Sequence, residues 1–236
     1  DALGQSSPLP YSDEDFEHYR KGDLPEYYVD RNFFKELMYK FVPMYKGNVN
    51  IRGGSTKTKY FVSAGYMRQG GPFKTERWDE YNYDNEQRVD RFTYRTNIEM
   101  QITKSLKAWL NLSGYLQDKN DPIIYGSADD AGGEGSYYYL LLAAFLDIPT
   151  LSFPDVNSDG NVVSVPGTDR TPYGMLNRSG YRITTTNTVN STLGIEQQLD
   201  FLTKGLSARV IISYDSWASH IRGFSRVYQT YVASLD

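Results

Sequence analysis

The chain has 236 residues, and its 25 Lys and Arg against 29 Asp and Glu give a formal net charge of −4. This balance is too acidic for a protein that grips nucleic acid through a basic face. With no Cys and only His18 and His220, the chain excludes a disulfide scaffold, a thiolate nucleophile and a multi-histidine metal centre. No run approaches the roughly 18–20 apolar residues of a membrane-spanning helix, and we expect no signal peptide on this chain.

The first forty-odd residues predict two short helices. Ser12 is a typical N-cap followed by three acids, and Gly22 is a plausible stop. A second helix is expected to start at Asp30 and to end near Pro43. Its apolar stripe at helical spacing consists of Phe33, Phe34, Leu37 and Phe41.

From Asn48 onward the hydrophobic period changes to two. Residues 92–102 alternate between an apolar even face and a polar odd face, and residues 106–116 repeat the pattern after a tight turn. We therefore expect these two segments to pair as an antiparallel hairpin. Residues 189–201 and 206–214 form a second such pair, and residues 49–51 and 60–66 a third. A strand spanning 183–202 and a seventh strand near 226–233 are also expected.

Connection lengths separate two kinds of all-β protein. Short turns fall around 54–57, 103–105 and 202–205, whereas the connections at about 68–90 and 118–182 are long. Alternating short and long connections are typical of outer-membrane barrels. The mean hydropathy of −0.57 does not argue against a barrel, because half of each spanning strand faces a polar lumen. The pattern alone leaves open a membrane barrel and a soluble all-β domain.

The amino-acid sequences of the strands favour the membrane barrel over the soluble domain. Residues 48–55 (NVNIRGGS) and 59–71 (KYFVSAGYMRQGG) resemble the first barrel hairpin of SusC/RagA-type TonB-dependent transporters. These are outer-membrane nutrient importers of Bacteroidetes-type bacteria. The resemblance extends through residues 94–98, 106–108, 111–114, 172–181 and 213–215. Residues 12–50 resemble the segment that joins the plug to the barrel. The predicted fold class is thus all-β, an antiparallel up-and-down meander of hairpins within a transmembrane β-barrel, with short N-terminal and loop helices.

The resemblance implies a function and partners. It implies an importer of oligosaccharides or peptides in the cell outer membrane, working with a SusD-like surface lipoprotein and, through parts that this chain lacks, with TonB. Residues 1–45 would connect plug and barrel, and residues 46–236 would form the N-terminal portion of the barrel. We expect contact with outer-membrane lipid, no nucleic acid, no cofactor and no enzymatic activity, since no catalytic constellation is visible. The alternative is a soluble carbohydrate-binding all-β domain.

Candidate substrate-binding residues follow from the strand alternation and from the loops. The polar positions expected to face the lumen are Arg91, Arg95, Glu99, Gln101, Trp109, Asn111, Tyr115, Glu196 and Gln198. Among these, Arg95, Trp109 and Tyr115 are the main candidates. Trp109 and Tyr115 are suggestive because aromatic rings stack on sugar faces; for these two, packing on the plug or a place in an aromatic girdle is the alternative. Loop candidates for ligand or lid contact are Trp78, Tyr81, Tyr83, Tyr137, Tyr138 and Tyr139, with loop packing as the alternative.

The opposite strand face tests the two fold classes. A barrel predicts that this face contacts lipid, whereas a sandwich predicts that protein covers it. The expected lipid-facing residues are Tyr60, Val62, Ile98, Met100, Leu110, Leu112, Leu193, Ile195 and Val210.

Two further segments carry separate expectations. Residues 137–146 predict a short loop helix capped by Ser136. Residues 155–161 match the first half of a calcium-binding loop, with oxygen ligands from Asp155, Asn157, Asp159 and Asn161. Pro166 occupies the position of the bidentate Glu, so Asp147 or Asp169 would have to complete the site. An Asx-type turn explains the same residues without a metal.

Overall fold

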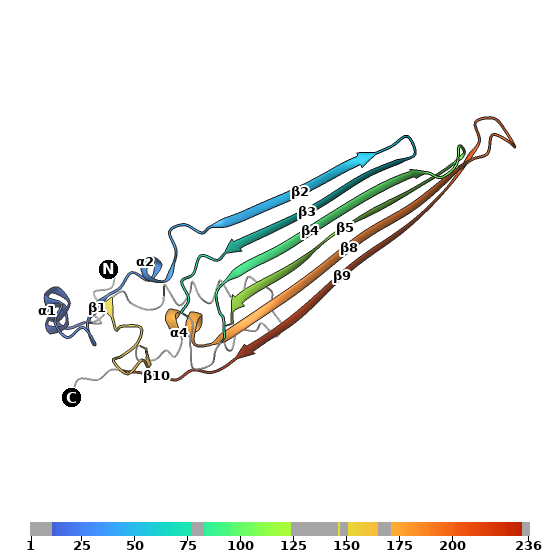
Figure 1. Ribbon diagram of the computed structural model, residues 1–236. Coiled ribbons are helices and arrows are strands. Elements are labelled where there is room, and N and C mark those ends of the chain that lie inside the picture. Colours follow the sequence, from blue (N-terminus) through green and yellow to red (C-terminus); the bar gives the residue numbers. More distant parts are fainter. Residues whose placement is uncertain (1–10, 77–82, 124–145, 147–150, 165–170, 233–236) are drawn as a thin grey trace, which may run out of the picture.

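The computed structural model describes residues 11–76, 83–123, 146, 151–164 and 171–232. Its main feature is a six-stranded antiparallel sheet with the strand order β2-β3-β4-β5-β8-β9 (Figure 1). The strands are β2 (Met44–Gly54), β3 (Thr58–Gly70), β4 (Arg88–Gln101), β5 (Leu106–Pro122), β8 (Gly180–Gln198) and β9 (Ser207–Ser225). Each strand lies beside its sequence neighbour, so the predicted all-β up-and-down meander is confirmed.

The three predicted hairpins are present. Phe92 pairs with Leu116, and Val49 pairs with Ala64. The hairpin of β8 and β9 has a longer turn than expected, because β8 ends at Gln198 and not at Leu202. The Asp200 carboxylate accepts a hydrogen bond of 2.7 Å from the Gly205 amide, and Gly205 has a φ of 79°. Residues 199–206 therefore form a closed turn that a longer strand would break.

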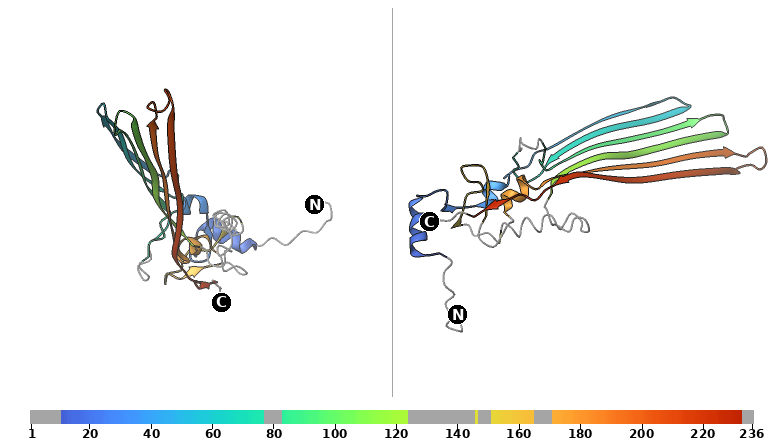
Figure 2. Two further views of the ribbon diagram at one scale, coloured as in Figure 1. Left: turned by 90° about the vertical axis from the view of Figure 1, so that its right-hand side faces the viewer. Right: turned by 90° about the horizontal axis from the view of Figure 1, so that it is seen from below.

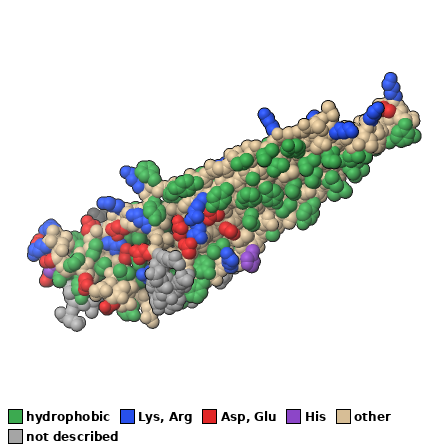
Figure 3. Space-filling model, viewed as in Figure 1, with side chains coloured by type: hydrophobic (Ala, Val, Ile, Leu, Met, Phe, Trp, Pro, Cys, Tyr) green, Lys and Arg blue, Asp and Glu red, His purple; other side chains and the backbone are tan. Residues whose placement is uncertain are grey.

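The register sorts the side chains of the sheet onto two faces, since directly paired residues of an antiparallel ladder point the same way. One row runs Tyr60, Ile98, Leu110, Leu193 and Ile212 across five strands. All nine residues expected to face lipid lie on this face, which we call the apolar face. Figure 3 shows its hydrophobic side chains as a continuous band along the sheet. All nine residues expected to face the lumen lie on the opposite, polar face.

Three glycines of the sheet lie beneath aromatic rings from the neighbouring strand. Gly53 faces Tyr60, Gly114 faces Tyr94 and Gly194 faces Trp109, each as a direct cross-strand pair. A Cβ at Gly194 would lie 2.1 Å from atoms of the Trp109 ring. The missing side chain thus makes room for the ring, which covers the exposed backbone in return.

The helices and short strands gather at the end of the sheet where the long connections lie (Figure 2). This loop-end module contains α1 (Asp13–Lys21), α2 (Phe33–Leu37), α4 (Pro172–Asn177), β1 (Val29–Asp30), β6 (Leu151–Ser152), β7 (Val162–Val163) and β10 (Thr230–Tyr231), with residues 71–76 and 83–87. Its hydrophobic core consists of Phe33, Leu37, Phe73, Val162, Tyr173, Met175 and Leu176. Segments far apart in the sequence therefore share one core.

The first predicted helix is confirmed at both ends. Ser12 and Asp15 form a reciprocal capping box, and Gly22 ends α1 in the left-handed conformation with a φ of 64°. The boundaries of the second were wrong: α2 starts after Asn32, whose side chain accepts a bond from the Lys35 amide, and it ends at Leu37. Phe41 is 80% exposed and lies beyond the end of α2, so it does not belong to the apolar stripe of the helix.

The seventh strand does not extend the sheet. Its segment forms only β10, which pairs in parallel with β7 inside the loop-end module. None of the helices in the described ranges is long and apolar enough to cross a membrane.

Candidate functional site

The polar face of the sheet brings the main candidate residues together. Arg95 on β4 pairs with Ser113 on β5. Two residues further along each strand, Tyr115 on β5 pairs with Thr93 on β4. Trp109 lies nearer the short turns, opposite Glu99. All three predicted residues thus share one face and adjacent strands, but Trp109 lies in a different depression from Arg95 and Tyr115.

Near the short turns, Trp109 lies in a depression of about 460 Å³. The Arg209 guanidinium lies 5.7 Å from the centre of the Trp109 ring and donates bonds of 2.9 and 2.6 Å to one Glu196 carboxylate oxygen. Lys107 and Glu99 close another side with an ion pair of 3.1 Å. The depression is therefore lined by an aromatic ring, by two ion pairs and by Lys59, which forms no ion pair among the described residues.

A second depression, of about 490 Å³, lies further along the same face. Arg95 and Tyr115 line it, together with Lys46, Phe61 and several Asn side chains. The Arg91 guanidinium carbon lies 3.9 Å from the Tyr115 ring centre, so this ring is held by cation–π stacking on one side. Cationic, amide and aromatic groups meet here.

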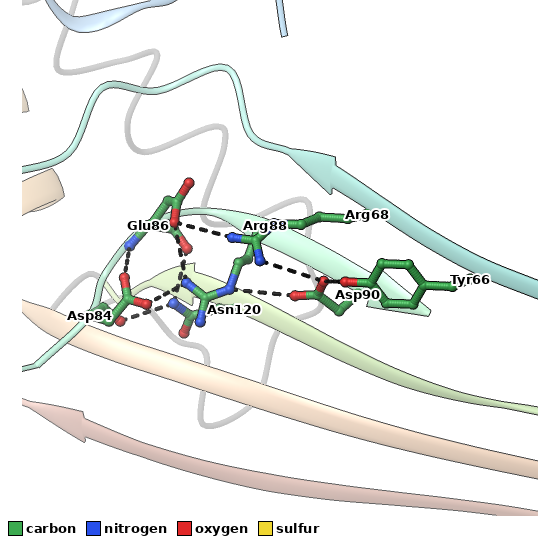
Figure 4. A network of polar contacts seen from close by, with 7 residues as sticks. All are labelled: Tyr66, Arg68, Asp84, Glu86, Arg88, Asp90 and Asn120. Atoms are coloured by element: carbon green, nitrogen blue, oxygen red, sulfur yellow. Dashed lines mark hydrogen bonds and ion pairs between the residues drawn. The ribbon is translucent and has the colours of Figure 1, made fainter. Parts of the chain in front are cut away.

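The apolar face ends in a charged cluster at the loop end of β3 and β4 (Figure 4). Arg88 contacts the carboxylates of Asp84, Glu86 and Asp90, and Tyr66 donates a hydrogen bond to Asp90. Ten residue steps from Phe92 to Ile102, at about 3.4 Å each, give ~34 Å of apolar strand below this cluster. A barrel strand tilt of 35–45° would reduce this to roughly 25 Å, the usual height of the lipid-facing band.

In the predicted calcium loop, the side chains of Asp155 and Asn157 bind other groups of the protein. The buried Arg31 binds Asp155 at 2.7 Å and donates to Glu36 at 2.7 Å. Burial raises the pKa of Asp155, and the neighbouring Arg31 opposes that rise. The Asn157 side-chain oxygen accepts bonds of 3.1 and 2.9 Å from the amides of Asp159 and Asn161. This is the Asx-type turn, and calcium binding stays a prediction.

The loop candidates divide into two groups. Tyr83 is buried, and its hydroxyl donates to the Asn177 carbonyl oxygen at 3.2 Å, so it packs within the loop-end module. Outside the described residues lie Trp78, Tyr81, Tyr137, Tyr138, Tyr139 and all but the last residue of the predicted helix 137–146. No group of three or more acidic or histidine side chains within metal-binding distance occurs among the residues that the structure describes.

Sequence reasoning missed three partners that shape the polar face. Arg209, Gly194 and the stacking role of Arg91 were not identified, since each acts through a residue on another strand. The alternation did place Arg91 on the correct face. A glycine at a position where the strand pattern expects a side chain was the available signal for Gly194.

Comparisons with known proteins agree with this geometry. No family model matches the chain. TonB-dependent receptor P26 of Formosa agariphila is 25% identical over 105 residues, which cover 44% of this chain and 9% of that receptor. The RagAB peptide importer in its closed-closed state is 18% identical with a TM-score of 0.57, and the match covers 89% of this chain and 22% of the other. For the open-open state the identity is 17% and the TM-score 0.56, over 93% of this chain and 24% of the other.

The chain therefore spans less than a quarter of the solved chains that it matches. The likeness of this chain to these solved structures establishes its fold. The curated relative is a TonB-dependent receptor. The chain is thus similar to TonB-dependent receptors of the SusC/RagA type, as its strand sequences predict, and its six-stranded sheet has the fold of a section of the RagA barrel.

Proposed function

We propose that this chain forms part of the barrel wall of an outer-membrane importer that takes up oligosaccharides or peptides. In this proposal the apolar face contacts lipid, the polar face lines the substrate lumen, and a SusD-like surface lipoprotein closes the loop end. Energy comes from TonB through parts of the importer outside this chain. The proposal includes no catalytic step.

The observation that carries the proposal is the exposure of the apolar face. Leu193, Ile195 and Val210 are 43%, 44% and 62% exposed. A soluble sandwich would bury such a face against a second sheet. Within the described ranges, the only other sheets are two-stranded and lie in the loop-end module. Contact with lipid would cover this face without further protein, because each strand of a membrane barrel turns its apolar side to lipid and its polar side to the lumen.

The outward order of side chains agrees with a membrane position. Along β3 and β4 toward the loop end, the aliphatic residues of the apolar face are followed by aromatic residues such as Tyr66 and Phe92. The charged cluster around Arg88 comes next. Aromatic girdles at the membrane interfaces are a general feature of barrels. The loop-end module, with its own water-excluding core, then lies beyond the headgroups.

The test uses the longest natural protein that carries this chain. We expect it to fractionate with the outer membrane, to purify together with a surface lipoprotein, and to be required for growth on one oligomeric nutrient. A deletion strain complemented with the intact gene is the control. Recovery of the protein in the periplasm or medium, free of detergent and of a lipoprotein, would contradict the proposal and favour the soluble carbohydrate-binding domain.

A further inference from the structure

The polar face carries an excess of positive charge, although the chain as a whole carries −4. By register, nine cationic side chains of the six strands point to this face, against four carboxylates. The cations are Lys46, Arg52, Lys59, Arg91, Arg95, Lys107, Lys119, Arg182 and Arg209, and the carboxylates are Glu99, Asp121, Glu196 and Asp215. An acidic chain has therefore placed a basic surface on one face of its sheet.

The excess is concentrated at one side of that face. On the other strands, three of the four cations have a carboxylate partner: Lys107 binds Glu99 at 3.1 Å, Lys119 binds Asp121 at 3.2 Å, and Arg209 binds Glu196 at 2.6 Å. Five cations on β2, β3 and β4 form no ion pair with any residue in the part of the chain that the structure describes. We call these five the cationic stripe: Lys46, Arg52, Lys59, Arg91 and Arg95.

The stripe borders groups that suit a carbohydrate. Lys46 and Arg95 line the depression of about 490 Å³, where the amides of Asn48, Asn50 and Asn190 also lie. Amide groups donate to and accept from sugar hydroxyls. The rings of Phe61 and Tyr115 supply flat apolar surface in the same depression. The buried Nε of Arg91 lacks a hydrogen-bond partner among the described residues.

We infer that the cationic stripe binds an anionic oligosaccharide, one that carries carboxylate or sulfate groups along its chain. This inference rests on the proposed import function and specifies its substrate class. Cations spaced along three neighbouring strands match charges repeated along an oligomer, whereas a single small anion would use only one or two of them. Hydroxyl-binding amides beside stacking rings favour a sugar chain over an acidic peptide.

The test measures binding to the full-length protein with its lipoprotein partner in detergent. The probes are oligogalacturonate, its methyl-esterified neutral form of the same length, a sulfated dextran oligomer and oligo-glutamate. The variant is Lys46→Gln with Arg95→Gln, and the matched control is Lys119→Gln, which removes a cation of the same face that already has a partner and lines neither depression. Outer-membrane assembly and lipoprotein association are recorded for every variant.

We expect at least one anionic oligosaccharide to bind about tenfold or more tightly than the neutral form, the effect of one charge-assisted hydrogen bond. The double variant should lose that preference, and Lys119→Gln should keep it within about twofold. Equal binding of charged and neutral sugars, no binding of either anionic sugar, tighter binding of oligo-glutamate, or an equal loss in Lys119→Gln would each overturn the inference. If wild-type protein fails to assemble in the outer membrane, the proposed function fails instead.

Discussion

The six-stranded sheet and the loop-end module bury their side chains in opposite ways. Every buried hydrophobic side chain among the described residues, apart from Pro122 at the end of β5, lies outside the six long strands. Leu176 in α4 has no exposed surface, whereas Leu193 in β8 is 43% exposed. The module therefore holds together as a water-soluble protein does. The sheet instead leaves its apolar side chains exposed, as the proposed contact with lipid requires.

The first prediction concerns equal substitutions in the two regions. Leu176→Ala should cost the module about 2–5 kcal/mol, because it leaves a cavity in a closed core. Leu193→Ala should cost the module nothing measurable. Hydrogen exchange at the amides of α4 reports the free energy of opening. Equal protection in the two variants would mean that the regions do not differ as described.

The second prediction compares an arginine introduced on the apolar face of β5 with one introduced on its polar face. Leu110→Arg places a cation on the apolar face and should cost roughly 2–4 kcal/mol of membrane stability if that residue lies near the bilayer centre. Asn111→Arg, the next residue on the opposite face, should be tolerated. Folded and unfolded fractions in lipid vesicles, measured in a urea series, compare them. Equal tolerance of both arginines would place neither face in lipid.

The glycine–aromatic pairs test whether ring packing holds the sheet in shape. Gly194→Ala should cost about 1–3 kcal/mol, since its Cβ would meet the Trp109 ring at 2.1 Å. Gly47→Ala is the control, because no atom lies within 4 Å of a Cβ there. Trp109 fluorescence reports displacement of the ring. A Gly194→Ala protein with wild-type stability and emission would show that the ring moves freely.

The smallest expected effect lies in α1. Hydrogen bonds from the Ser12 backbone and hydroxyl lower the pKa of Asp15. A lowered pKa stabilises the helix above the unfolded value of about 3.9 and loses that effect as the pH falls through the folded value. Because Asp15 is only partly buried and stays in contact with water, we expect only a few tenths of a kcal/mol.

Amide exchange of α1 at neutral pH and at pH 2.5 measures this contribution. The wild-type helix should exchange faster at the lower pH after correction for the intrinsic rate, and Asp15→Asn should reduce that difference. Asp13→Asn is the control, because it removes a first-turn charge without touching the Ser12 bonds. An unchanged difference in Asp15→Asn would contradict the capping account.

The sheet was predictable because its strand sequences alternate apolar and polar residues, which assigns each residue to one of two faces. Residues 92–102 show this directly, and their pairing with residues 106–116 follows from the tight turn between them. The module was not predictable in this way. The contact of Phe33 with the Tyr173 region joins segments that no local pattern links. Asn32 replaces Asp30 as the cap of α2, and the Arg31 side chain lies buried against Asp155.

The candidate site shows the same division. Strand alternation placed Arg95, Trp109 and Tyr115 on one face, and the register confirms that placement. The ion pairs of Lys107 and Arg209 depend on which strands are neighbours, and so does the lack of an ion pair between the cationic stripe and any described residue. Only the structure supplies that information, and the loop candidates Trp78, Tyr81 and Tyr138 lie outside the described residues.

The most direct test of the account is cysteine labelling along β4 in outer membranes. This chain contains no cysteine, so single substitutions can be read against a clean background once any in the rest of the protein are removed. We predict that a membrane-impermeant maleimide labels Arg95→Cys and Asn97→Cys on the polar face. Thr96→Cys and Ile98→Cys on the apolar face should stay unlabelled until detergent is added. Equal labelling of all four positions in intact membranes, or the reverse pattern, would contradict the central claim that the apolar face contacts lipid.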